Sequence, residues 1–109
     1  MQPEQKHPLV EVYHSIMDGE LWDLFIIPIC PYCNFTHSHG APKSDKLKIG
    51  EQGWKRPHCS GGIGGPDYRI VYLGKSWPKS AGEKKKIIDD LKARGLTSKI
   101  GEWDENAEF

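Results

Sequence analysis

The residue types best suited to chemistry in this chain are its cysteines and histidines, which gather between residues 30 and 59. Cys30 and Cys33 are separated by two residues, so a tight turn between them points both sulfurs toward one centre. Zn²⁺ prefers four thiolate or imidazole ligands arranged as a tetrahedron. Cys59 is the remaining one of the three cysteines in the sequence, which makes it the natural third thiolate. The fourth ligand is then expected to be a histidine.

Three histidines are candidates for that fourth position, and the sequence leaves the choice among them open. We favour His37, then His39, then His58. His37 and His39 lie two residues apart, so an extended backbone places both on one face. His58 is next to Cys59 and is expected to point away from it. The predicted cofactor is Zn²⁺, with a second, open metal position as an alternative, and the predicted ligands are Cys30, Cys33, His37, His39 and Cys59.

Enzymatic chemistry is the less favoured interpretation of the same pattern. Cys-Pro-Tyr-Cys after an apolar segment resembles the glutaredoxin active site, in which a thiolate at a helix N-terminus attacks disulfides. That site needs a helix directly after the second cysteine, whereas residues 34–40 are polar and rich in histidine. A metal nuclease usually carries a second Cys-x-x-Cys pair, which this chain lacks. We therefore assign no catalytic residue and expect a non-catalytic module.

A longer string of residues resembles a known group of proteins. Cys-Pro-Tyr-Cys-x₃-His-x-His-Gly, followed by His-Cys-x-Gly and a Tyr-x-Ile strand, is similar to small zinc-finger-like proteins of actinobacteria and their phages and plasmids. The resemblance covers residues 28–73 and implies an origin in a mobile element, but it implies no reaction. Asn34 stands where that family usually has Gly, and Asn also tolerates the left-handed backbone conformation. The metal ligands that the resemblance implies are Cys30, Cys33, His37 or His39, and Cys59.

The strands that must position these residues are indicated by local patterns. Residues 9–16 alternate between apolar and polar side chains, and residues 21–29 are rich in aromatic and β-branched side chains. Asp18-Gly19 between them is typical of a β-hairpin turn. Residues 68–73 predict a further strand, and residues 40–57 predict a long loop.

One helix is predicted near the end of the chain. Ser80 and Glu83 fit a capping box at its N-terminus, and Gly95 is a suitable residue just past its C-terminus. Apolar residues at helical spacing between them, at positions 87, 88 and 91, form a stripe. We therefore predict an α+β domain, stabilised by zinc, with antiparallel β-hairpins and a C-terminal helix. It spans residues 1–100, and residues 101–109 form an acidic, mobile tail.

Length and composition exclude several classes of protein. A chain of 109 residues predicts one domain. Such a short chain buries only about 60–70% of its unfolded surface, so a bound metal would help the fold materially. No apolar segment approaches the ~18–20 residues that span a membrane, and the first residues lack the apolar core of a signal peptide. We expect a cytoplasmic protein that does not bind membranes.

The distribution of charge indicates a partner, although the net charge is zero. Basic residues are in excess between residues 41 and 94, and both ends of the chain are acidic. A basic region of this kind is typical of nucleic-acid binding, in which Trp54 and Tyr68 would stack on bases. The predicted contacts are Lys43, Lys46, Lys48, Trp54, Lys55, Arg56, Lys84, Lys85 and Lys86.

Protein partners are the alternative to nucleic acid. The sequence has four Trp, a residue type enriched among the energetically important residues of interfaces. We therefore also consider an accessory protein of a phage or plasmid that binds or inhibits a larger protein or nucleoprotein complex. Cys59→Ser should lower thermal stability sharply, because structural zinc contributes directly to folding, whereas His14→Ala should not.

Overall fold

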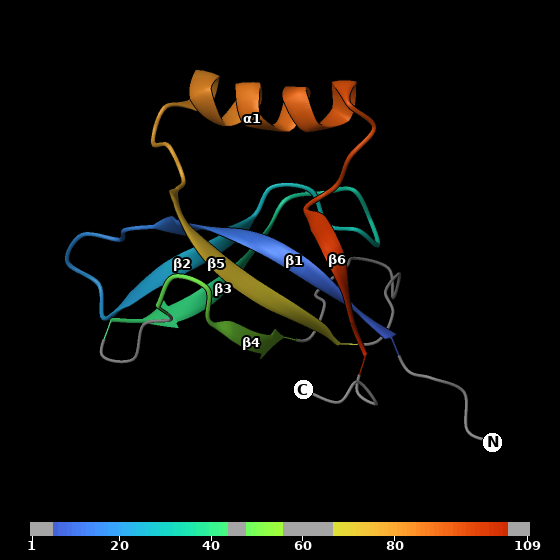
Figure 1. The fold of residues 1–109 in the computed structure, drawn as a ribbon. Coiled ribbons are helices and arrows are strands. Elements are labelled where there is room, and N and C mark those ends of the chain that lie inside the picture. The colour runs from blue at the N-terminus through green and yellow to red at the C-terminus, as the bar shows by residue number, and fades with distance from the viewer. Residues whose placement is uncertain (1–5, 44–47, 56–66, 105–109) are drawn as a thin grey trace.

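The fold is mixed α+β and consists mostly of strands (Figure 1). The computed structural model describes residues 6–43, 48–55 and 67–104. None of the helices in these residues is long and apolar enough to cross a membrane. In chain order the elements are β1 Lys6–Ser15, β2 Trp22–Ile27, β3 His37–Pro42, β4 Gln52–Lys55, β5 Tyr68–Ser76, α1 Ala81–Ala93 and β6 Lys99–Asp104.

Strand β1 is the centre of one sheet with the order β3-β2-β1-β5-β4, and β6 also pairs with β1. The end of β1 is antiparallel to β2, with Tyr13 opposite Ile26, and its beginning is antiparallel to β6, with Leu9 opposite Gly101. Strand β5 runs parallel to β1 along the opposite edge. Because β2 and β6 follow one another along a single edge of β1, and the register shifts within β1, the sheet curls.

The predicted hairpin of β1 and β2 is confirmed. The pairs β2–β3 and β4–β5 are also antiparallel, although neither β3 nor β4 was predicted as a strand. The parallel pairing of β1 with β5 was not predicted. It places Leu9 opposite Arg69, and no local pattern signals a pairing between segments so far apart in the chain. Among the described strands, this parallel pair joins β5 and β4 to β1, β2 and β3 in one sheet.

Two short strands differ from the sequence-based prediction. The predicted loop over residues 40–57 contains β4, in which Gly53 lies opposite Ile70 of β5. Strand β6 runs past the predicted domain boundary at residue 100, so residues 101–104 belong to the sheet. Each pairs its backbone with a longer strand, β4 with β5 and β6 with β1. Residues 105–109 of the predicted tail lie outside the described residues.

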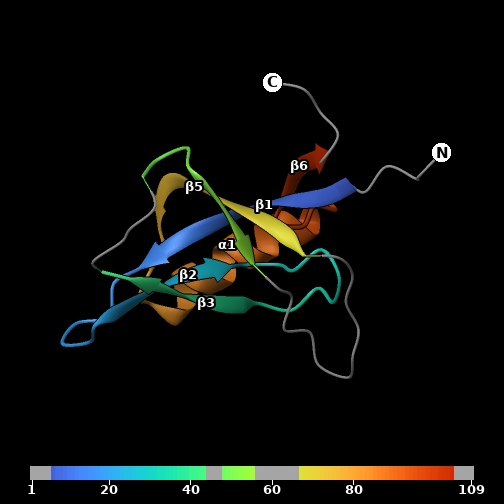
Figure 2. The same cartoon turned by 90° about the horizontal axis from the view of Figure 1, so that it is seen from below.

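The core lies on one face of the sheet, and α1 lies over the other face (Figures 1 and 2). Strand alternation turns Glu11 and Tyr13 away from the core and toward the helix. The helix therefore adds no buried residue, and its predicted apolar stripe is only half-buried. The core consists of Val10, Val12, Phe25, Ile27, Cys30, Ala41, Tyr68 and Ile70.

The helix is held mainly at its two ends. At the N-terminus, the Glu83 backbone N–H donates to the Ser80 hydroxyl at 3.3 Å, which confirms the predicted cap. Before it, the N–H of the buried Trp77 donates to the carbonyl of His14 at 2.8 Å. At the C-terminus Gly95 has a φ of +67°, the left-handed conformation that glycine adopts most readily.

Ser98 joins the segment after the helix to two other parts of the chain. Its carbonyl accepts from the N–H of Glu11 at 2.9 Å, and its own N–H donates to the carbonyl of Ile29 at 2.9 Å. The N–H of Ile29 in turn donates to the Ser98 hydroxyl at 2.9 Å. Ser98 is buried, so these bonds fix the backbone immediately before Cys30 against β1 and the approach to β6.

Candidate metal centre

Cys30, Cys33 and His37 converge at the connection between β2 and β3. One ligand atom from each residue lies within 4.8 Å of the others, and Cys33 Sγ is 3.0 Å from His37 Nε2. In a tetrahedral zinc site the ligand atoms are separated by about 3.3–3.8 Å. Small side-chain adjustments would therefore place these three residues at three corners of a tetrahedron, and this Cys₂His group could hold a metal ion.

The backbone of the loop explains why the two sulfurs meet. Cys30 N–H donates to the carbonyl of Phe35, and Asn34 N–H donates to the carbonyl of Cys30, each at 2.9 Å. Asn34 has a φ of +64°, the left-handed conformation that its sequence position predicts. The N–H of Tyr32 donates to Cys30 Sγ at 3.4 Å, so the loop backbone also helps to orient this sulfur. The turn is thus built to present both sulfurs on one side.

His39 shares a face of β3 with His37, as predicted, but it has a different partner. The burial of β3 alternates so that both histidines are on its inner side. His39 is buried, and its Nε2 is hydrogen-bonded to the Tyr68 hydroxyl at 2.6 Å. Among the described residues, the group that could hold a metal contains His37 and does not contain His39. His37 therefore remains the preferred histidine ligand.

Tyr68 packs against the loop between β2 and β3 that contains Cys30 and Cys33, called the metal loop below. The sequence had predicted a different role for this residue. Its side chain is fully buried, and the ring of Tyr32 stacks on it at 6.1 Å between centroids with a 4° interplanar angle. A buried ring cannot stack on nucleic-acid bases, so the predicted role of Tyr68 in base stacking is wrong. Instead Tyr68 connects β5 to the metal loop through Tyr32 and to β3 through His39.

The remaining predicted ligand, Cys59, and its neighbour His58 lie outside the described residues. Cys30 and Cys33 are free cysteines rather than a disulfide pair. After Cys33 the chain makes a turn and continues as β3, so the helix that a glutaredoxin site requires does not follow the motif.

The predicted nucleic-acid contacts are dispersed over the structure. Lys43 Nζ donates to the carbonyl of Met17 at 2.6 Å and lies 3.5 Å from Asp23 Oδ1, so this lysine ties the hairpin together. Lys48 is exposed. Lys46 and Arg56 lie outside the described residues, and of Trp54 and Lys55 only the backbone, in β4, is described.

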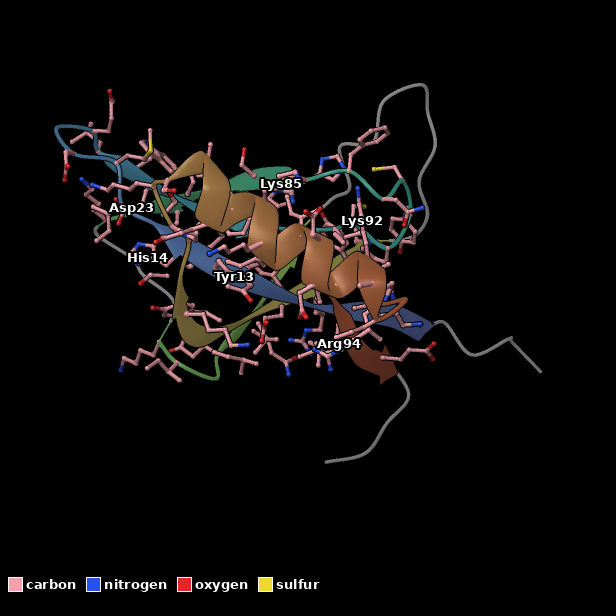
Figure 3. The ribbon with its side chains drawn as sticks, turned by 90° about the horizontal axis from the view of Figure 1, so that it is seen from above. Tyr13, His14, Asp23, Lys85, Lys92 and Arg94 are labelled. Carbon is pink, nitrogen blue, oxygen red and sulfur yellow. The ribbon has the colours of Figure 1, made fainter. Side chains whose placement is uncertain are left out.

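The three consecutive lysines of the prediction lie on α1, and Figure 3 labels the middle one, Lys85. Lys85 is exposed and forms an ion pair with Asp89 at 3.1 Å. Lys84 is half-buried, whereas Lys86 is exposed and lines a cleft beneath the helix. The helix therefore carries basic side chains on several sides rather than on one stripe.

A buried carboxylate beside His14 was missed from the sequence. The Asp23 side chain is fully buried, and its Oδ2 lies 2.8 Å from His14 Nε2 (Figure 3). Its Oδ1 accepts from the N–H of Met17 at 3.0 Å. The hydrogen bond from Met17 is the largest effect on the pKa of Asp23. Together with the hydrogen bond from His14 and the charge of Lys43, it outweighs burial, which raises the pKa, and lowers the pKa of Asp23 to about 2. The signal in the sequence was a single acid within the apolar run over residues 21–29.

This contact gives His14 a structural role that the sequence did not indicate, and it gives a pH prediction. His14→Ala removes a donor from a buried carboxylate, so it should lower the melting temperature by several degrees. The pKa of Asp23 is lower in the folded than in the unfolded state. Its contribution to the stability of the fold is therefore present above about pH 4 and is lost as the pH falls toward about 2.

Thermal melts of the wild type and Asp23→Asn between neutral and acid pH measure this contribution. The wild type should be the more stable near pH 6, and the difference should shrink between about pH 4 and 2. Taking the difference removes acid effects that both proteins share, such as release of a metal. A difference that stays constant across this range would contradict the assignment.

No family model matches the chain, and no curated protein and no solved structure is significantly similar to it. The fold and the site therefore define only a class. The protein is a small mixed α+β domain, mostly of strands, in which a Cys₂His group could hold a metal ion.

Proposed function

We propose that the protein is a non-catalytic module in which Zn²⁺ bound at the β2–β3 loop stabilises the fold, and that nucleic acid is its partner. The observation that carries the metal assignment is the convergence of Cys30, Cys33 and His37, whose ligand atoms lie within 4.8 Å of one another. Two sulfurs and an imidazole nitrogen are a donor set that favours zinc over harder cations. Cys59 is the proposed fourth ligand, as the sequence and the resemblance to mobile-element zinc-finger-like proteins imply.

Metal stoichiometry tests the first half of this proposal. The purified chain, supplied with Zn²⁺ under reducing conditions and then dialysed, should retain about one zinc per chain by mass spectrometry of the elements. His37→Ala should lose that zinc, whereas His39→Ala, a matched change two residues away, should retain it. A wild-type chain that holds no metal would overturn the zinc assignment, and loss of zinc only in His39→Ala would move the ligand to that residue.

The case for nucleic acid depends on α1, because it presents Lys84, Lys85 and Lys86 away from the core. If these lysines contact phosphates, binding should weaken with salt, with a slope of log K against log salt of about −0.9 for each phosphate neutralised. Of the other lysines of the prediction, Lys43 is less available because it is bonded within the hairpin, whereas Lys48 is exposed.

Fluorescence anisotropy with labelled single-stranded DNA, duplex DNA and RNA measures this dependence. Changing Lys84, Lys85 and Lys86 together to Gln should weaken binding and reduce the salt slope by about 3, because each lysine that neutralises a phosphate accounts for about one unit of slope. Lys79→Gln, an exposed change outside the helix, should alter neither quantity. Binding that is absent, or that does not respond to salt, would remove nucleic acid as the partner.

A protein partner remains the second candidate because of an apolar patch at the tip of the β1–β2 hairpin. Leu21 is 82% exposed and Trp22 is 54% exposed, and Ile16 and Met17 are exposed beside them. Exposed apolar patches often mark protein interfaces. Recovery of one stoichiometric protein by the wild type, and its loss in Trp22→Ser, would favour this function over nucleic-acid binding.

A further inference from the structure

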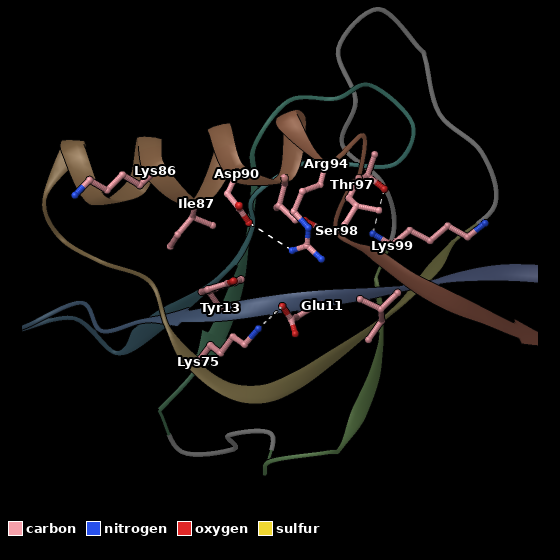
Figure 4. Close-up of a pocket in the computed structure, with 13 residues that line it drawn as sticks. Glu11, Tyr13, Lys75, Lys86, Ile87, Asp90, Arg94, Thr97, Ser98 and Lys99 are labelled. Carbon is pink, nitrogen blue, oxygen red and sulfur yellow. Dashed lines mark hydrogen bonds and ion pairs between the residues drawn. The ribbon is translucent and has the colours of Figure 1, made fainter.

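A cleft of about 480 Å³ separates α1 from the outer face of the sheet (Figure 4). Its floor contains Glu11 and Tyr13 of β1 and Lys75 of β5, and the segment from Leu96 to Ile100 closes one end. Its roof is the underside of α1, which has no buried residue. The volume is within the range of about 300–1,000 Å³ that is typical of sites for small molecules.

The cleft is preformed because its walls are fixed by contacts outside it. Before the helix, Trp77 is buried, bonded to the carbonyl of His14, and packed edge-on against the ring of Tyr13 at 5.5 Å. After the helix, Ser98 is bonded to Glu11 and Ile29. The roof is thus anchored at both ends, and between them its apolar stripe is only half-buried, although a helix of 13 residues depends on tertiary packing for its stability. A ligand in the cleft would supply that packing.

The lining combines apolar surface with an excess of positive charge. Ile87, Leu91 and the ring of Tyr13 provide apolar area between the roof and the floor. The charged lining residues are the bases Lys75, Lys86, Arg94 and Lys99 and the acids Glu11 and Asp90.

The ion pairs within this lining are long and solvent-exposed. Lys75 lies 3.3 Å from Glu11, and Arg94 lies 3.5 Å from Asp90. Exposed pairs of this kind contribute little energy, so an incoming anion can compete for the cations. Lys86 has no carboxylate partner among the residues that the structure describes. Burial is the largest effect on the pKa of Tyr13 and raises it. The Tyr13 hydroxyl therefore stays protonated and can donate a hydrogen bond to an anion.

We propose that this cleft binds a small amphipathic organic anion, with its apolar body between Tyr13, Ile87 and Leu91 and its negative group beside Arg94 (Figure 4). Carboxylates, sulfonates and phosphates share the chemistry that this arrangement recognises. The site shares no residue with the metal centre, and Arg94 is not among the lysines proposed to contact nucleic acid.

The fluorescent dye 8-anilinonaphthalene-1-sulfonate is a suitable probe, because it joins aromatic rings to one negative charge. Its fluorescence should rise saturably with one site per chain, and 2-naphthoate should displace it, whereas the neutral isostere 2-naphthamide should not. Leu91→Asp should weaken dye binding by at least about tenfold, a change of about 1.4 kcal/mol. Leu21→Asp, the same change at the exposed hairpin tip, should leave it unaffected.

Charge is tested on one helix with a matched pair of variants. Arg94→Gln should weaken binding of the dye and of 2-naphthoate severalfold, and Lys92→Gln, an exposed change outside the cleft, should not. Near-ultraviolet circular dichroism of each variant confirms that dye fluorescence does not arise from a loosened fold. The proposal would be overturned if 2-naphthamide displaced the dye as well as 2-naphthoate does, or if Leu21→Asp weakened dye binding as much as Leu91→Asp. It would also be overturned by a dimer that forms through the cleft and excludes the dye.

Discussion

Cys33→Ser is expected to lower the melting temperature by at least about 10 °C. The change removes one of the three candidate zinc ligands that the structure describes, and structural zinc contributes directly to folding. Cys33 is half-buried and outside the group of fully buried core residues, so the change removes little packing. Addition of a chelator should lower the melting temperature of the wild type to a similar value and should leave Cys33→Ser unchanged. Thermal melts by circular dichroism, with and without chelator, measure both effects.

The matched control for this variant is Ser38→Ala, which lies on the exposed face of β3 between the two histidines. It should melt within a few degrees of the wild type and keep its response to chelator. If Cys33→Ser melted like the wild type in the presence of stoichiometric zinc, no metal would stabilise this fold, whatever the spacing of its ligands.

Tyr68→Ala is expected to have the second large effect. The side chain is fully buried, stacks on Tyr32 of the metal loop and bonds to His39 of β3. Truncation of a buried aromatic residue to alanine costs about 3–5 kcal/mol, since it removes apolar contacts and leaves a cavity. Because β5 and the metal loop meet at this ring, the variant should also bind Zn²⁺ more weakly. Denaturant unfolding and a zinc competition titration measure the two effects separately.

Tyr68→Phe separates the hydroxyl from the ring. It keeps the stacking on Tyr32 but removes the 2.6 Å hydrogen bond to His39, so we expect a loss of about 1–3 kcal/mol. Tyr72→Phe, on the same face of β5 and half-buried, is the matched control and should change stability little. A Tyr68→Phe variant as stable as the wild type would show that the bond to His39 contributes nothing.

Local patterns were sufficient for the elements whose causes lie within a few residues. Asp18-Gly19 indicated the β1–β2 hairpin and Ser80 the start of α1, and the structure confirms both. The turn that brings Cys30 and Cys33 together, with His37 and His39 close by in the chain, also followed from spacing, because a turn and a short strand relate these residues directly. Metal binding and the identity of the metal stay predictions.

Other features depended on contacts between distant segments. The parallel pairing of β1 with β5, the recruitment of β4 and β6 into the sheet, and the ring of Tyr68 beneath the metal loop have no local signal. The predicted apolar stripe of α1 is correct as a pattern, but it lies over the outer face of the sheet instead of the core.

The sequence by itself therefore determined the Cys-x-x-Cys turn, its nearby histidines, the first hairpin and the capped helix, since each is decided by short-range geometry and backbone preference. Only the tertiary structure decided which histidine faces the sulfurs and which bonds to Tyr68, that Asp23 is buried beside His14, and that a lined cleft opens under the helix. The physical reason is that two side chains on the same face of one strand are equivalent until the opposing strand is in place. The closure of the sheet supplies that strand.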